Sequence, residues 1–355
     1  MTETNQDFPR LDAYTSTLSA DQAAAWLLEA GAGGPVSVMT HTKPDGDAFG
    51  SVVAVVGTLC ALGMEAHGYV VPPIHSGVGR LPGQELVSVV NGTAGGAQVP
   101  AEGSLVIVDT GAWSQVGPLA GVVAGRLERT LLIDHHLSGD IPAGARHIDG
   151  GAAACCEVLY PILGHCLVSG GLGMPDAVRD GLYAGITSDT GWFRFSNTRP
   201  GTLRAAADLV EMGVDSPTLL ATLEQSERPE KLALLRRAIG SLELWHDQSV
   251  AVMTLRRADF EATGALEEET ERFVDVPQQV MTVKVVVLVV EKLEGGGCKL
   301  SFRSKPGDDA VNVSELARTF GGGGHARASG ARVSVSVEEA VGLLRERVGE
   351  VLGRG

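Results

Sequence analysis

The chain has 355 residues, of which 44% are hydrophobic and 20% charged, and its formal net charge is −15 at pH 7. This length is sufficient for two domains with separate cores. The acidic balance disfavours a protein that grips long nucleic acid through a broad basic face, but it is compatible with a local basic pocket for a small anionic ligand.

The cysteines and the apolar runs bear on the cellular compartment. The five cysteines include no C-x-x-C pair, which is typical of reduced, buried thiols in a cytosolic protein. The N-terminal stretch "MTETNQDFPR" is polar and acidic, unlike a secretory signal peptide. The most apolar run, "VMTVKVVVLVV" at 280–290, is too short to span a membrane and predicts a strand. We therefore expect a cytoplasmic protein without a membrane segment.

Strand-like and helix-like segments alternate through the first half of the chain. Four short apolar runs predict strands, at 36–39, 68–71, 105–108 and 131–133. The longest helical segment, "AFGSVVAVVGTLCALG", begins at Ala48 and ends near Gly63. This alternation predicts an α/β domain with a doubly wound parallel sheet.

The pattern changes after Arg199. Residues 200–244 are helical and charged, and we interpret them as a connection between two lobes. Beyond it, "SVAVMTLRR", "QQVMTVKVVVLVVEKL" and "CKLSFRSK" predict strands of a smaller mixed sheet, and "SVEEAVGLLRERVGEVLG" predicts an amphipathic helix. The predicted organisation is a first α/β domain at 1–199, a helical linker at 200–241 and a second α/β domain at 242–355.

A tight turn at 41–51, "HTKPDGDAFGS", joins the first predicted strand to the long helix. Pro-Asp-Gly is a strong turn signal, and Asp47 has the position of a helix N-cap. Capping explains one carboxylate but leaves His41 and Asp45 without a role. Open α/β sheets place their ligands at strand-end turns of this kind, so these side chains are expected to belong to a ligand site.

Further carboxylates and imidazoles follow other apolar stretches, in "LVIVD", "LLIDHH" and "GITSDTGWFRF". The full set is His41, Asp45, Asp47, Asp109, Asp134, His135, His136 and Asp189. Because the carboxyl ends of parallel strands meet at one edge of a sheet, these groups are expected to form a single cluster. Crowded carboxylates repel one another unless cations lie between them. A mixed carboxylate and imidazole set suits Mn²⁺, with Mg²⁺, Co²⁺ or Zn²⁺ as alternatives.

These segments resemble a known family. "HTKPDGDAFGS", "VDT", "DHH" and "GITSDTGWFRF", in that order, resemble the four motifs of the DHH phosphoesterases. In the second half, "SFRS" and "VNVSELARTFGGGGHARASG" resemble the DHHA1 domain. The similarity extends from Gly34 to the C-terminus and is greatest to the NrnA-type branch, whose members are oligoribonucleases (nanoRNases) and phosphatases of 3′-phosphoadenosine-5′-phosphate (pAp).

The resemblance implies two Mn²⁺ ions, with Mg²⁺ or Co²⁺ as alternatives. It implies that His41, Asp45 and Asp109 hold one ion. It implies that Asp47, Asp109, His135 and Asp189 hold the other, so that Asp109 bridges the two. His136 would face the phosphate and the leaving group, and Asp134 would orient the histidines. The implied chemistry is hydrolysis of a phosphoester by two-metal hydroxide attack.

The glycine cluster "GGGGHARASG" allows two interpretations. It is not a Walker P-loop, because no Lys-Ser/Thr pair follows the glycines. Glycine runs are common in flexible linkers. The resemblance instead favours a clamp for a terminal phosphate, because exposed backbone N–H groups and arginine hold phosphate well. The expected substrate-binding residues are Arg303, Gly323, Gly324, His325 and Arg327.

The resemblance implies a phosphodiesterase and phosphatase acting on short RNAs, on linear dinucleotides such as pApA and pGpG, and on pAp. A stand-alone cyclic di-AMP phosphodiesterase is the main alternative. A RecJ-type exonuclease is disfavoured by the net charge and a family II pyrophosphatase by the glycine cluster. A non-catalytic nucleotide-binding regulator is disfavoured because every ligand position is filled. Members of the family can dimerise, but the sequence leaves open whether this chain forms a homodimer.

Overall fold

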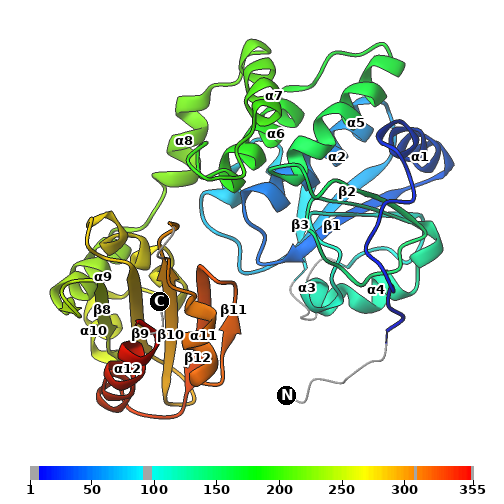
Figure 1. Ribbon diagram of the computed structural model, residues 1–355. Coiled ribbons are helices and arrows are strands. Elements are labelled where there is room, and N and C mark those ends of the chain that lie inside the picture. Colours follow the sequence, from blue (N-terminus) through cyan, green and yellow to red (C-terminus); the bar gives the residue numbers. More distant parts are fainter. Residues whose placement is uncertain (1–7, 91–97, 308–309, 353–355) are drawn as a thin grey trace. The chain divides into compact units, whose positions relative to one another are not determined.

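The computed structural model describes residues 8–90, 98–307 and 310–352. The chain divides into two units, Met1–Ser226 and Glu227–Gly355, and each unit has its own six-stranded sheet (Figure 1). Helices α7 (Pro200–Glu211) and α8 (Ser216–Glu224) belong to the first unit, and α9 (Pro229–Gly240) belongs to the second. The predicted fold class, two α/β lobes with one parallel and one mixed sheet, is confirmed.

The sheet of the first unit is parallel throughout and has the order β3-β2-β1-β4-β5-β6. Its strands are β1 (Val36–Thr42), β2 (Ala66–Val71), β3 (Val87–Val89), β4 (Ser104–Val108), β5 (Thr130–Asp134) and β6 (Ala145–Ile148). The four strands predicted from the sequence correspond, in chain order, to β1, β2, β4 and β5. The sequence did not predict β3 and β6, because both are short edge strands without the apolar run that a doubly covered strand requires.

Successive residues of the central strands face two different cores, which is the packing expected of a doubly wound sheet. Val106 and Val108 of β4 lie in the core beneath the long helices, whereas Leu105 and Ile107 lie in the opposite core. The helices on the first face include α1 (Ala20–Gly33), α2 (Gly46–Ala61), α5 (Cys155–Ser169) and α6 (Asp176–Asp189). The short helices α3 (Trp113–Val116) and α4 (Ala120–Ala124) cover the second face.

The long predicted helix corresponds to α2, but its N-cap differs from the prediction. Asp45, not Asp47, is the N-cap, and its Oδ1 accepts hydrogen bonds from the backbone N–H groups of Asp47 and Ala48, both at 3.0 Å. Asp47 is the second residue of the helix, in its first turn, and is fully buried. The capping role therefore belongs to Asp45, and the carboxylate of Asp47 needs another explanation.

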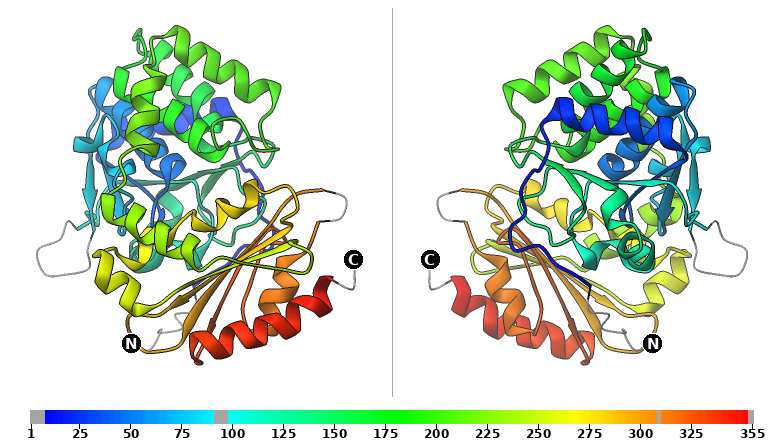
Figure 2. Two further views of the ribbon diagram at one scale, coloured as in Figure 1. Left: turned by 90° about the vertical axis from the view of Figure 1, so that its left-hand side faces the viewer. Right: turned by 90° about the vertical axis from the view of Figure 1, so that its right-hand side faces the viewer.

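The second unit has the strand order β11-β12-β10-β9-β8-β7, in which β8 and β9 pair in parallel and the other described neighbours pair antiparallel. Its strands are β7 (Glu243–Trp245), β8 (Val250–Leu255), β9 (Val285–Glu291), β10 (Cys298–Ser304), β11 (Gly323–Gly324) and β12 (Ala328–Val333). Helices α11 (Val313–Thr319) and α12 (Val337–Leu352) pack on one face, and α9 and α10 (Arg257–Thr263) on the other. Figure 2 shows α12, coloured red, lying along the sheet.

Two segments of the second unit differ from the prediction. The apolar run predicted as a strand from residue 280 pairs only from Val285, because Val280 and Val283 donate hydrogen bonds within turns instead. The glycine cluster is not an unstructured linker. Gly323 and Gly324 pair with β12, and the backbones of His325 and Ala328 exchange two hydrogen bonds, so the cluster forms a tight hairpin. None of the helices in the described ranges is long and apolar enough to cross a membrane.

Candidate metal centre

Three adjacent strands end at the candidate site. His41 lies near the end of β1, Asp109 directly follows β4, and Asp134 is the last residue of β5. The order β1-β4-β5 places these three ends side by side, as expected for a parallel sheet. Asp189 enters the cluster in another way, because it is the last residue of helix α6.

The first group of potential ligands is His41, Asp45 and Asp109, whose donor atoms all lie within 4.8 Å of one another. His41 Nε2 is 3.5 Å from Asp109 Oδ2. The other ring nitrogen, Nδ1, lies 2.9 Å from the carbonyl oxygen of Thr42, which can only accept a hydrogen bond. Nδ1 therefore carries a proton, and Nε2 is the nitrogen that faces the carboxylates.

The second group is Asp47, His135 and Asp189, whose donor atoms lie equally close together. His135 Nε2 is 3.4 Å from Asp189 Oδ2 and 3.9 Å from Asp47 Oδ2. It is also 3.3 Å from Asp109 Oδ1. Asp109 thus directs Oδ1 toward the second group and Oδ2 toward the first.

The carboxylate of Asp47 is fixed by the start of helix α5. The backbone N–H groups of Cys155 and Cys156 donate to its Oδ2 and Oδ1, at 2.6 and 2.9 Å. A helix N-terminus stabilises a negative charge, so α5 holds Asp47 in one orientation. These two donors could not be predicted from the sequence, because backbone amides leave no signature in side-chain chemistry.

Asp134 lies behind the two histidines and is fully buried. Its Oδ1 accepts hydrogen bonds from the backbone N–H groups of His135 and His136, at 2.8 and 3.2 Å, and lies 2.7 Å from His136 Nδ1. The hydrogen bond to Asp134 raises the pKa of His136. The side chain of His136 is 46% exposed, so its Nε2 edge is open to a ligand while Nδ1 is held.

The carboxylates raise the pKa values of the imidazoles that face them. Burial lowers the pKa of His41, but its hydrogen bonds to Asp109 and the Thr42 carbonyl, together with the charges of Asp109 and Asp45, outweigh this and bring the pKa to about 9. In the same way, burial opposes the hydrogen bond to Asp109 and the charges of Asp47 and Asp189, which together raise the pKa of His135 to about 10. Burial and then the charge of Asp109 raise the pKa of Asp189 to about 7. In the protein without bound metal, protonated imidazoles therefore offset the carboxylate charge.

Divalent metal ions fit this set of donors. Asp109 is only 2% exposed, and although His135 Nε2 lies 3.3 Å from its Oδ1, no donor in the described structure meets that oxygen in good hydrogen-bond geometry. A buried carboxylate oxygen without a donor is costly unless a cation completes its environment. The backbone of Asp109 also adopts φ of +59°, an uncommon conformation for a residue with a side chain and one that is concentrated at functional sites. Carboxylate and imidazole donors without thiolate are typical of Mn²⁺ and of similar divalent ions.

The residues expected to bind substrate lie together in the second unit. Arg303 of β10 is paired in register with Ala328 of β12, the residue that follows Arg327. Gly323, Gly324, His325 and Arg327 are all exposed. The hairpin therefore presents Arg327 beside the end of β10 that carries Arg303, where cationic and backbone donors are accessible to an anion.

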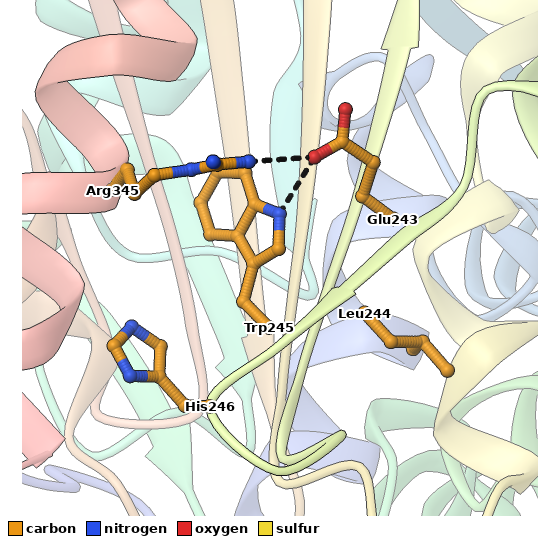
Figure 3. Close-up of a pocket in the computed structure, with 5 residues that line it drawn as sticks. All are labelled: Glu243, Leu244, Trp245, His246 and Arg345. Carbon is orange, nitrogen blue, oxygen red and sulfur yellow. Dashed lines mark hydrogen bonds and ion pairs between the residues drawn. The ribbon is translucent and has the colours of Figure 1, made fainter.

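A separate hollow lies beside the edge strand β7 of the second unit (Figure 3). The guanidinium of Arg345 stacks over the ring of Trp245, 4.6 Å from its centroid, and donates to Glu243 Oε2 at 2.8 Å. The indole N–H of Trp245 donates to the same oxygen, also at 2.8 Å. These three side chains satisfy one another, so packing at the sheet edge explains them.

Comparison with known proteins agrees with this fold. Residues 35–186 match the DHH family, N-terminal domain, and residues 247–353 match the DHHA1 domain. A bifunctional oligoribonuclease and PAP phosphatase NrnA from Thermus thermophilus is 30% identical over 324 residues, which cover 90% of this chain and 91% of that protein. The protein of the same name from Bacillus subtilis is 27% identical over 310 residues, covering 86% and 91%.

A solved structure supports the fold. The crystal structure of an exopolyphosphatase-related protein from Bacteroides fragilis superimposes with a TM-score of 0.82 at 20% identity, covering 96% of this chain and 99% of that one. The parallel sheet with its acidic and imidazole cluster, followed by a mixed sheet, defines a metal-dependent phosphoesterase. The chain belongs to the DHH family, with an N-terminal DHH domain and a C-terminal DHHA1 domain, and is a hydrolase of phosphoester bonds.

Proposed function

We propose that this protein is a Mn²⁺-dependent phosphodiesterase and phosphatase that hydrolyses short oligoribonucleotides, linear dinucleotides such as pApA and pGpG, and pAp. The observation that carries the proposal is the position of Asp109, which directs one carboxylate oxygen toward each of two groups of ligands. The similarity to two proteins named bifunctional oligoribonuclease and PAP phosphatase supports the choice of substrates.

Two metal ions fit the two groups. His41, Asp45 and Asp109 would hold one ion. Asp47, His135 and Asp189, with Asp109 between the groups, would hold the other. Bound there, divalent cations would polarise the phosphoryl oxygens and make hydroxide available at neutral pH for in-line attack.

The proton for the leaving group comes from His136. Its Nδ1 is held by Asp134, so Nε2 is the nitrogen that can approach a substrate. The hydrogen bond that raises its pKa favours the protonated ring, which is the form that a general acid needs. As the bond between phosphorus and the leaving oxygen breaks, Nε2 donates its proton to that oxygen.

The hairpin of the second unit binds the phosphate at the other end of the substrate. Arg303, His325 and Arg327 supply cationic donors, and Gly323 and Gly324 allow the backbone to approach the ligand closely. Arginine–phosphate contacts are charge-assisted, and they select a terminal phosphate over a neutral end. This assignment predicts a preference for short substrates that carry such a phosphate.

The test is a panel of substrates incubated with the purified protein and Mn²⁺. The panel contains pAp, pApA, a 5-mer RNA, a 24-mer RNA, cyclic di-AMP and pyrophosphate, and Asp109→Asn serves as the control for contaminating nuclease. We expect turnover of pAp, pApA and the 5-mer, with little on the 24-mer or pyrophosphate. Preferential hydrolysis of cyclic di-AMP would replace the proposal with a cyclic-dinucleotide phosphodiesterase, and cleavage of pyrophosphate alone would contradict it.

A further inference from the structure

A segment that precedes the DHH-matching region runs along the candidate site. Residues 8–18 lie before the first matched residue, 35, and their trace is dark blue in Figure 1. Leu11 N–H donates to the carbonyl of Asp140, and the N–H groups of Thr17 and Leu18 donate to the carbonyl of Arg146 in β6. Backbone hydrogen bonds therefore hold the segment against the first unit near both of its ends.

Tyr14, in the middle of this segment, reaches the buried carboxylate behind the histidines. Its hydroxyl donates to Asp134 Oδ2 at 2.5 Å. Two glycines make room for the ring. A Cβ at Gly111 would lie 1.9 Å from the Tyr14 oxygen, and a Cβ at Gly139 would lie 2.4 Å from the ring carbon Cε2. The backbone around the site is therefore shaped to admit this particular side chain.

The two oxygens of Asp134 have different partners. Oδ1 takes the donors from His135 and His136, and Oδ2 takes the hydroxyl of Tyr14. A buried carboxylate whose two oxygens are both engaged cannot rotate without breaking hydrogen bonds, and rotation would move its contact with His136 Nδ1. Burial and the adjacent negative charge raise the pKa of Tyr14 well above its usual range, so the phenol remains a donor.

We propose that Tyr14 is a positioning residue of the active site, which acts through Asp134 to hold His136 in the orientation that protonates the leaving oxygen. This inference rests on the proposed function, because it requires His136 to be the proton donor. Tyr14 lies outside both segments that match the family models, in the stretch that precedes the DHH-matching region.

The dependence on the leaving group distinguishes positioning from a general structural role. The leaving oxygen of pApA is a sugar hydroxyl, which must receive a proton, whereas p-nitrophenolate leaves bis-p-nitrophenyl phosphate without one. Tyr14→Phe should lower kcat on pApA by roughly 10–100-fold, the usual effect of losing a partner behind the reacting groups. The KM for pApA, the Mn²⁺ content and turnover of the nitrophenyl ester should change less than about twofold.

Two further variants are measured alongside. Tyr160→Phe is the matched control, since Tyr160 also donates to a carboxylate, that of Asp208 at 3.2 Å, on the exposed side of helix α5. It should leave both substrates unaffected. Asp134→Asn tests the route of the effect. If Tyr14 acts through Asp134, adding Tyr14→Phe to Asp134→Asn should lower kcat on pApA by less than about twofold.

The outcomes separate the inference from the function on which it rests. His136→Ala should show the same selectivity for pApA as Tyr14→Phe, but with a larger loss. If His136→Ala is selective and Tyr14→Phe has no effect or slows both substrates equally, the role of Tyr14 is overturned and the function stands. If His136→Ala slows both substrates equally, His136 is not the proton donor, and the inference falls with that assignment.

Discussion

Two charged groups of this molecule contrast with each other, the carboxylate cluster of the first unit and the Glu243–Trp245–Arg345 group of the second. In the second unit, the side chains of Arg345 and Glu243 are 62% and 55% exposed, and cation and anion match one to one. In the first unit, Asp47 and Asp109 are almost completely buried, and carboxylates outnumber the imidazoles that face them. An exposed group in which each charge has a partner is accounted for by packing. A buried excess of one charge indicates a ligand of the opposite charge.

The largest expected effect is at Asp109, the carboxylate shared by both groups of ligands. Asp109→Ala should abolish turnover and the binding of Mn²⁺ while the fold survives. Burial and then the charge of Asp109 raise the pKa values of Asp45 and Asp47, and removing that charge relieves the repulsion. Elemental analysis and a thermal melt of the variant measure both effects. Retained Mn²⁺ stoichiometry would show that Asp109 does not link the two groups.

The next effect is at His136, whose Nδ1 contacts Asp134 while much of its side chain stays exposed. His136→Ala should reduce the rate on pApA by roughly 10²–10⁴, the usual range for a lost proton-transfer group. Its Mn²⁺ content should stay close to that of the wild type. If the variant loses its metal instead, His136 is a ligand, and the roles of the two histidines have been divided wrongly.

The third effect is the pH dependence of metal binding. Since the pKa values of His41 and His135 are about 9 and about 10 without metal, both rings carry protons at pH 7, and an incoming cation must displace them. Affinity should therefore rise with pH by about tenfold per unit for each displaced proton and level off above about pH 10. Titration of the metal-free protein with Mn²⁺ in weak buffer should acidify the solution. Affinity that is independent of pH between 6 and 8 would mean that the binding of Mn²⁺ does not displace protons from these imidazoles.

The smallest effect concerns the exposed cations of the second unit. Arg327→Ala should raise the KM for pApA through the loss of about 1.5–3 kcal/mol, the range for a charge-assisted hydrogen bond, and should leave kcat nearly unchanged. Turnover of bis-p-nitrophenyl phosphate should hardly change, because this ester lacks a terminal phosphate. Arg345→Ala is the matched control, an exposed arginine of the same unit with a partner of its own, and should alter neither substrate. Equal losses on both substrates in Arg327→Ala would assign the hairpin to the fold instead of to binding.

The parts of the molecule that could be predicted from sequence are those whose physics is local. The strands β1, β4 and β5 are buried on both faces, so they appear as continuous apolar runs, and the residues after them are brought to one edge by parallel pairing alone. The long helix α2 could be predicted for the same reason, because it is also a long, buried apolar segment. Short edge strands such as β3 and β6 are not, because partial exposure removes the apolar run.

The support of the site could not be predicted in this way. Tyr14 is 120 positions from Asp134 in the sequence and lies in a polar stretch, so only the folded chain shows that the two are in contact. The amides of Cys155 and Cys156 that hold Asp47 are backbone groups, which every residue but proline has. Even the N-cap of α2 is set by the backbone, because the helix begins directly after Asp45 and not after Asp47. Chemistry-bearing side chains are visible in a sequence, whereas the donors that orient them are visible only in three dimensions.

In the proposed function, the buried cluster holds two divalent cations with Asp109 between them. Crystals grown with Mn²⁺ and measured at the manganese absorption edge test this claim most directly, because anomalous scattering locates the metal itself. We expect two peaks in the first unit, one next to His41 and Asp45 and the other next to Asp47, His135 and Asp189, both in contact with Asp109. A single peak, or two peaks of which either does not touch Asp109, would contradict it.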